Sequence, residues 1–170
     1  MRRSGLASIL PALLLIFTAC IGGVRYGFAG GGLPAHIRTV AVMPFENRTT
    51  LPDLTSEIHE LLRSELDRRL GLRPAPEQRA DALLTGVILR YDADVPIGFS
   101  ADPRQANTAR RKLQIAVDIS IVDQTTGRTL WERRNLVVDG EYAERADAEG
   151  RQRALEQLIN QIIEGAQSQW

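Results

Sequence analysis

The hydrophobic pattern of this chain is clearest in its second half, where apolar and polar side chains alternate over residues 113–121. The apolar positions are Leu113, Ile115, Val117, Ile119 and Ile121. A period of two predicts a β-strand with one face in the core and the other toward solvent or a partner. Residues 123–128 supply hairpin turn chemistry, with Gly127 able to adopt positive φ, and residues 129–139 predict the paired strand.

Two further runs predict strands with apolar residues on both faces. Residues 39–45 form a short, β-branched run stopped by a proline, and residues 80–91 follow a proline-containing link at 73–78. The polar segments 46–52 and 96–108 predict loops. Charged residues at 132–134 indicate an edge or solvent-facing position for the 129–139 strand.

Apolar residues at three- and four-residue spacing predict two amphipathic helices. Asp53 or Thr55 can cap the first, which should end at Gly71. Its stripe with polar edges is Leu54, Ile58, Leu61, Leu62, Glu65, Leu66, Arg69 and Leu70. The second runs from about Ala146 to Trp170, with the stripe Leu155, Leu158, Ile159, Ile162, Ile163, Ala166 and Trp170.

The predicted order is strand, helix, three strands and a final helix, and each helix has one side to bury. This order predicts the α+β class, as a two-layer sandwich: a small mixed β-sheet of about four strands with two helices packed on one face. A right-handed crossover through the first helix places the strands at 39–45 and 80–91 parallel, and the hairpins continue the sheet antiparallel. We expect residues 33–170 to form this single α+β domain.

Residues 1–19 have the features of an export signal: two arginines, an apolar run too short to span a bilayer comfortably, and small residues before Cys20. Residues 17–20 resemble a bacterial lipobox, in which Cys20 becomes the lipidated first residue of the mature protein. An ordinary signal peptide with a chance cysteine is the alternative. Cys20 is the only cysteine in the sequence, so it has no internal disulfide partner.

The segment 20–32 is rich in glycine and is predicted to be a tether. It follows no strand and opens no helix, which makes it a poor candidate for a phosphate-binding loop. Ile21, rather than Asp, follows Cys20, and the general sorting pattern of bacterial lipoproteins then points to the outer membrane of a Gram-negative cell.

Without residues 1–19 the chain keeps 19 basic and 21 acidic residues, a balance that argues against a general nucleic-acid or anionic-membrane binder. His36 and His59 lack cysteine or spaced carboxylate partners, so no metal site is predicted. No catalytic or cofactor-binding motif appears, and we expect neither an enzyme nor a cofactor. Asp92 and Asp94 fit a solvated strand end better than an acid–base pair.

One basic cluster stands out from the balanced chain. It consists of Arg104, Arg110, Arg111 and Lys112, and Asp102 is the only acid near it in the sequence. Guanidinium groups pair bidentately with phosphates, so the cluster is a candidate binding site for an anionic glycolipid. A solvated loop that keeps the strand end soluble is the alternative.

A set of short segments, taken in order, carries a family resemblance. They are residues 33–34, 37, 39–42, 44–47, 52, 80–83, 86, 91, 122–123, 126–127, 130–131, 142 and 170. Together they resemble the LPS-assembly lipoprotein family (LptE). The resemblance implies a small sheet with two helices on one side. It also implies an outer-membrane lipoprotein, facing the periplasm or a barrel lumen, that plugs the β-barrel translocon LptD, assists its assembly and contacts lipopolysaccharide.

This sequence departs from that family near its start, because Tyr26 comes six residues after Cys20 instead of in a Gly-Tyr pair directly after it. Residues 40–47 also resemble outer-membrane lipoproteins of the curli-secretion type and activators of peptidoglycan synthases. A pore former needs hairpins with a lipid-facing apolar side. The hairpin at 108–139 has one such strand, and its partner carries the charges at 132–134, so we prefer the plug.

Overall fold

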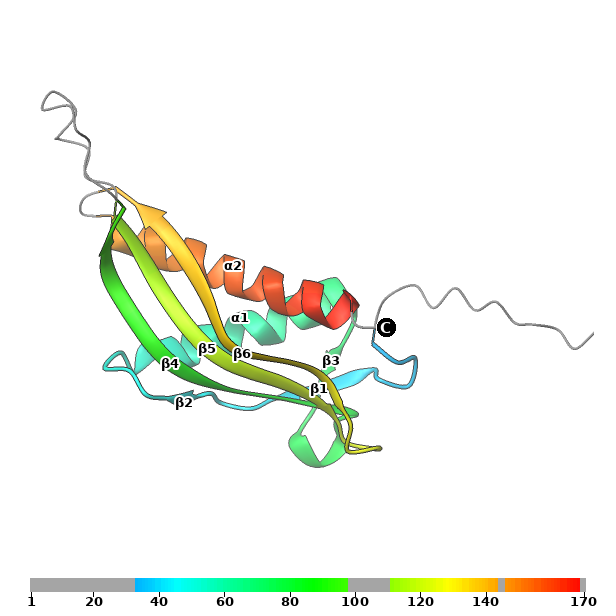
Figure 1. The fold of residues 1–170 in the computed structure, drawn as a ribbon. Coiled ribbons are helices and arrows are strands. Elements are labelled where there is room, and N and C mark those ends of the chain that lie inside the picture. The colour runs from blue at the N-terminus through cyan, green and yellow to red at the C-terminus, as the bar shows by residue number, and fades with distance from the viewer. Residues whose placement is uncertain (1–32, 98–110, 144–145, 169–170) are drawn as a thin grey trace, which may run out of the picture.

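The computed structural model describes residues 33–97, 111–143 and 146–168 (Figure 1). The strands are β1 (Thr39–Val42), β2 (Glu46–Asn47), β3 (Arg73–Pro74), β4 (Ala82–Pro96), β5 (Arg111–Asp123) and β6 (Thr129–Tyr142). The helices are α1 (Asp53–Leu70), the short 3₁₀ helix η1 (Glu77–Arg79) and α2 (Asp147–Ser168). No helix within the described residues is long and apolar enough to cross a membrane. The signal segment, the tether with Cys20, Arg104, Arg110 and Trp170 lie outside the described residues.

The strands form one mixed sheet in the order β3-β1-β4-β5-β6, and β2 continues beside β4. β1 and β4 are parallel, with Val40 opposite Ala82, while β4, β5 and β6 pair antiparallel. Both helices lie on the same face of the curved sheet (Figure 1). The α+β class, the parallel crossover and the edge position of the last strand are therefore confirmed.

The predicted count of four strands is wrong, because β2 and β3 bring the count within the described residues to six. Both lie in segments predicted as a loop and a link. Each is two residues long and is held only by distant backbone partners: the amide of Arg73 donates to Arg38 O at 3.0 Å, and that of Arg48 to Ile88 O at 2.9 Å. Two residues show no hydrophobic period, so sequence patterns cannot find such strands.

The first helix ends as predicted, at Gly71 with φ 66°. The predicted cap at its start is wrong, since Pro52 occupies the N-cap position without a side-chain hydrogen bond and Asp53 is already helical. Proline fixes φ near the helical value, and Asp53 in the first turn favours the positive end of the helix dipole. Leu61, placed on the apolar stripe, is 36% exposed in a groove between α1 and α2.

The core lies between the sheet and the two helices. Its largest fully buried side chains are Leu54, Ile58, Leu62, Leu66, Leu84, Ile88, Leu113, Ile115, Ile121, Leu158, Ile162 and Ile163. The alternation along β5 is confirmed, because its predicted apolar positions are all buried. Two glycines allow close packing: a Cβ at Gly86 would overlap the Phe45 ring, and one at Gly165 would overlap the indole of Trp131.

The three long strands set the length of the molecule. β5 has 13 residues, which at about 3.3 Å per residue gives a span of about 40 Å. Irregularities in its pairing with β4 and β6 strengthen the local twist, consistent with the curvature in Figure 1. In β6, Asn135 takes φ 48° at such a position, and its amide donates to Asp118 Oδ1 at 2.7 Å.

Candidate functional site

The described members of the basic cluster lie at one end of the sheet, which we call the loop end: residues 92–97, 111–114 and 139–142. Arg111 and Lys112 are the first two residues of β5. The guanidinium of Arg111 forms an ion pair with Asp94 of β4, and Lys112 Nζ lies 3.4 Å from Asp139 Oδ2 of β6. The two basic side chains are 40% and 27% exposed. Both cations therefore remain accessible from solvent, beside carboxylates.

Asp139 is a loop-end acid that the sequence pattern did not reveal. The antiparallel register places it opposite Gln114, whose amide donates to Asp139 Oδ1 at 2.7 Å. Its own backbone amide donates to Gln157 Oε1 of α2 at 2.8 Å. Asp139 is 27 positions from Lys112 in the chain, so only the strand register brings the two together.

Asp92 and Asp94, whose side chains are 43% and 57% exposed, lie near the end of β4, which continues to Pro96 beyond the predicted end at Tyr91. Asp92 Oδ2 lies 2.7 Å from Arg90 Nε, and Asp94 pairs with Arg111. Two exposed carboxylates, each beside a guanidinium, match the solvated strand end and not an acid–base pair.

Helix α2 fixes the position of the loop end. The hydroxyl of Tyr142, which is buried, donates to the carbonyl of Ala93, and the guanidinium of Arg153 donates to the carbonyl of Glu141. Burial raises the pKa of Tyr142. Because these bonds join β4, β6 and α2, they hold in place the strands on either side of the basic residues of β5. They also cover part of the β6 edge.

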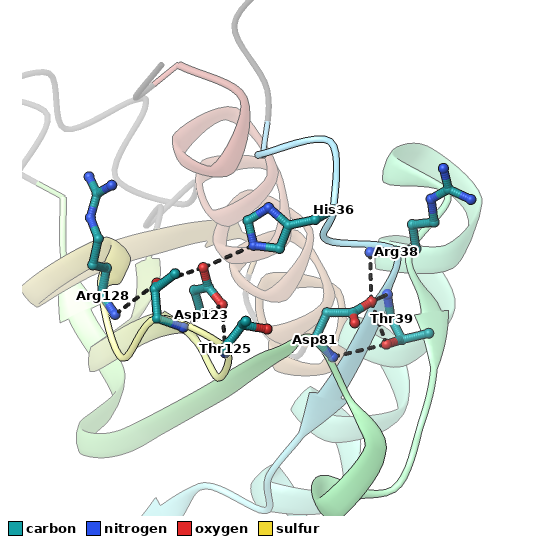
Figure 2. A network of polar contacts seen from close by, with 8 residues as sticks. His36, Arg38, Thr39, Asp81, Asp123, Thr125 and Arg128 are labelled. Carbon is teal, nitrogen blue, oxygen red and sulfur yellow. Dashed lines mark hydrogen bonds and ion pairs between the residues drawn. The ribbon is translucent and has the colours of Figure 1, made fainter.

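A polar network holds the opposite end, which we call the tether end: residues 33–39, 73–82 and 123–128 (Figure 2). Asp123 is only 2% exposed and accepts from the Thr125 amide at 2.8 Å, the Thr126 hydroxyl at 2.7 Å and His36 Nε2 at 2.9 Å. The hydrogen bond from Thr126, followed by that from His36, outweighs burial and lowers the pKa of Asp123 to about 2.

A second carboxylate, Asp81, fastens the entering chain to β4. Asp81 Oδ2 accepts from the amides of Arg38 and Thr39 at 2.9 and 2.8 Å and from the Thr39 hydroxyl at 2.8 Å. The hydrogen bond from the Arg38 amide is the largest of the effects that lower the pKa of Asp81. The backbone amide of Gln124 donates to the Asp81 carbonyl at 2.8 Å, which links the chain around Asp81 to the β5–β6 turn.

Sequence reasoning gave residues 123–128 only a turn role and did not single out Asp81. An Asp that accepts from amides two and three residues later is an Asx turn, so the order Asp123, Thr125, Thr126 was an available signal. The partner His36 was not predictable, because it lies 87 positions away in the chain.

The two histidines do not meet. His36 pairs with Asp123, whereas His59 lies on α1 beside β1, with its Nδ1 buried and without a hydrogen-bond partner within the described residues. Across residues 33–97, 111–143 and 146–168, no group of three or more His, Cys, Asp or Glu side chains is placed to hold a metal ion.

Replacing Asp123 by Asn should lower the melting temperature at neutral pH, because a neutral amide is a weaker acceptor for Thr126 and His36 than a carboxylate. The pKa of Asp123 is about 2 in the folded chain against an ordinary 3.8. The stabilisation by the ionised group is therefore fully present above about pH 4 and is lost as the pH falls toward about 2. The melting temperatures of the parent chain and the variant should therefore converge as the pH falls from about 4 toward 2. A difference in melting temperature that does not change with pH would contradict the role given to the ionised Asp123.

Several solved structures are similar to this chain at low sequence identity. The PelC dodecamer from Paraburkholderia phytofirmans has a TM-score of 0.50 and 16% identity, over 82% of this chain and 95% of that one. The hypothetical protein CT253 from Chlamydia trachomatis has a TM-score of 0.49 and 13% identity, over 75% and 97%. A putative lipoprotein from Caulobacter crescentus has a TM-score of 0.44 and 20% identity, over 74% and 86%. At these identities the first of them supports the fold alone.

Among proteins with curated descriptions, none is significantly similar to this chain in sequence. The family model for LptE, described as lipopolysaccharide-assembly, matches residues 37–165. That range starts two residues before β1 and takes in the whole sheet, α1 and all of α2 except its last three residues. The chain therefore belongs to the LptE family of lipopolysaccharide-assembly proteins, as its sequence pattern predicted.

Proposed function

We propose that this protein is an outer-membrane lipoprotein that plugs the β-barrel translocon LptD, assists its assembly and contacts lipopolysaccharide during insertion into the outer leaflet. The observation that carries this proposal is the LptE family match over residues 37–165, since the family is a non-enzymatic one of lipopolysaccharide assembly. In this proposal, residues 1–19 are removed, Cys20 is lipidated and residues 20–32 form the tether.

The length of the sheet supports a role across a membrane. β5 is about 40 Å long along its curved path, comparable to the hydrocarbon core of a bilayer, which is about 30 Å thick. The described chain begins at the opposite end of the sheet from the start of β5, whose first two residues are Arg111 and Lys112 (Figure 1). A domain tethered to the inner leaflet at one end thus has the reach to present these two cations near the outer leaflet.

The charged residues of β6 favour a position in a water-filled barrel lumen and not one facing lipid. The edge strand β6 exposes Glu132, Arg133 and Arg134 in its middle, and Arg134 pairs with Glu132 at 2.7 Å. Charged side chains at that depth are costly against lipid tails, whereas the interior of an outer-membrane barrel is polar. A position inside a barrel is compatible with both the length of this strand and its exposed charges.

The loop end has groups that suit a glycolipid phosphate. Arg111 and Lys112 are partly exposed and paired with exposed carboxylates, and an ion pair open to solvent contributes about 0–1 kcal/mol. A phosphate carries more charge than one carboxylate and accepts bidentate bonds from Arg111. Exchange of these partners for lipopolysaccharide phosphates is therefore energetically accessible, with Arg104 and Arg110 proposed as further contacts.

Replacing Arg110, Arg111 and Lys112 together by Ser should weaken lipopolysaccharide binding by about tenfold or more, since charge-assisted bonds contribute about 1.5–3 kcal/mol each when formed. The effect should shrink at high salt, because exposed charges are screened within about 8 Å at physiological ionic strength. The measurement is a titration of purified protein with lipopolysaccharide at low and high salt, with circular dichroism to monitor folding.

The matched control for this titration replaces Arg38, Arg73 and Arg79 of the tether end by Ser, which removes the same charge. This control should lose clearly less lipopolysaccharide affinity than the loop-end variant, because the proposed glycolipid site is the loop end and the control removes only a general attraction between charges. Equal losses of lipopolysaccharide affinity in both variants would mean that only the net charge of the protein matters, which would contradict the proposed site.

A further inference from the structure

The tether end is a rigid surface through which the chain enters the domain. His36 pairs with the β5–β6 turn through Asp123 at 2.9 Å, and Gln124 donates from its side chain to the Glu77 carbonyl of η1 at 2.8 Å. β3 is held to the same surface, because the amide of Arg73 donates to the Arg38 carbonyl at 3.0 Å. Three segments far apart in the sequence are thus locked together beside Leu33.

The segments of the tether end contain four exposed arginines, which we call the tether-end arginines: Arg38, Arg73, Arg79 and Arg128. Figure 2 shows the side chains of Arg38 and Arg128 on either side of His36, both extending away from the strands toward the side from which the chain enters. Arg38 joins the network through its backbone amide, which donates to Asp81, and its carbonyl, which accepts from Arg73, so these two bonds do not fix its guanidinium.

The acids of the same surface are mostly engaged. Asp123 is buried under its hydrogen bonds, and Asp81 accepts from two amides and a hydroxyl. Glu77 is exposed. The tether end thus has four exposed arginines against three carboxylates, of which only Glu77 is exposed, so the exposed charge of this surface is mainly positive and its net charge is slightly positive.

We propose that the tether-end arginines bind the anionic phospholipid headgroups of the leaflet that holds the lipid anchor. This proposal rests on the lipid anchor proposed above. The 13 residues from Cys20 to Gly32 can span at most about 45 Å, so the surface next to Leu33 stays within that distance of the anchored leaflet. Arginine pairs with phosphate through two parallel hydrogen bonds, and basic residues near a membrane are attracted to anionic lipids.

The consequence is a fixed orientation. A lipid anchor alone leaves the domain free to rotate about its tether, whereas a second, electrostatic contact holds the tether end toward the membrane. The loop end then points away from that leaflet, with about 40 Å of β5 between the two ends. Docking of this kind orients the domain so that its loop end enters the barrel first.

The test isolates charge from lipidation. The mature chain, residues 20–170 with Cys20→Ser, is sedimented with phosphatidylcholine vesicles that do or do not contain phosphatidylglycerol. We expect binding only to the vesicles with phosphatidylglycerol. Replacing Arg38, Arg73 and Arg79 together by Ser should weaken this binding by about tenfold or more, given the attraction of each basic residue near an anionic surface. Melting curves check that the variant remains folded.

The loop-end variant with Arg110, Arg111 and Lys112 replaced by Ser loses the same charge and serves as the control. It should weaken vesicle binding clearly less than the tether-end variant does. Equal weakening in both variants, no weakening in the tether-end variant, or displacement from the vesicles by inorganic phosphate at matched ionic strength would each overturn the proposal. The lipopolysaccharide titration uses the same two variants with the opposite expected order, so failure of one proposal is distinguishable from failure of the other.

Discussion

Replacing Ile162 by Asp should unfold the domain or leave it marginally stable. Ile162 is fully buried on the face of α2 that packs on the sheet, within the main hydrophobic core. A carboxylate there has no cation to pair with in that apolar core, and burial of an unpaired charge costs several kcal/mol. We expect a loss of about 4 kcal/mol or more from the free energy of unfolding, which for a domain of this size is about 5–15 kcal/mol.

Chemical denaturation monitored by circular dichroism measures this loss. The matched control is Gln167→Asp, which introduces the same charge on the same helix at an exposed position. It should lower the free energy of unfolding by about 1 kcal/mol or less, because the new charge is exposed and meets only the negative end of the helix dipole. Similar denaturation midpoints for the two variants would mean that α2 presents a different face to the sheet.

Replacing Gly140 by Ala should separate α2 from the loop end. β6 and α2 cross so closely that a Cβ on Gly140 would overlap the carbonyl oxygen of Gly150 and lie 2.9 Å from the amide nitrogen of Ala154. Both contacts are backbone atoms, so no side-chain rotation relieves the overlap and the helix must move. We expect a loss of about 3 kcal/mol or more, at the upper end of what overpacking costs.

The same change should weaken lipopolysaccharide binding, because Gly140 lies opposite Leu113 and next to Asp139, which holds Lys112. The matched control is Gly71→Ala, where φ is 66° and no atom lies within 4 Å of an added Cβ. It carries the conformational cost without the overlap and should lose about 1 kcal/mol with unchanged binding. If Gly140→Ala is no more destabilising than this control, the close crossing of β6 and α2 is not present.

Sequence patterns predicted the elements whose signal repeats over many residues. The alternation of β5 and the stripe of α2 each involve five or more apolar positions, and burial of those positions is what forms the core. The parallel pairing of β1 and β4 followed from the handedness of crossovers, which is a property of the chain and not of any one residue. Leu61 shows the limit of this reasoning, because an apolar stripe does not reveal how far apart two helices lie.

Features that depend on one long-range contact were not predictable. The two-residue strands β2 and β3, the pairing of Lys112 with Asp139 and the contact of Gly140 with Gly150 join positions that only the folded sheet brings together. The start of α1 was missed for a local reason: two plausible capping residues hid the proline that occupies the N-cap. At the candidate site, the basic residues were visible in the sequence, but their carboxylate partners were set by strand register.

The most direct test of the proposed plug is to isolate the lipidated protein from outer membranes and identify what it brings with it. A photoreactive amino acid at Arg133, exposed in the middle of β6, gives the test spatial resolution. The account predicts a large β-barrel protein recovered in equal amount and crosslinked from Arg133, together with a mature N-terminus at a lipid-modified Cys20. Recovery of a ring of this chain alone, of a peptidoglycan synthase, or of an unmodified N-terminus at another residue would contradict it.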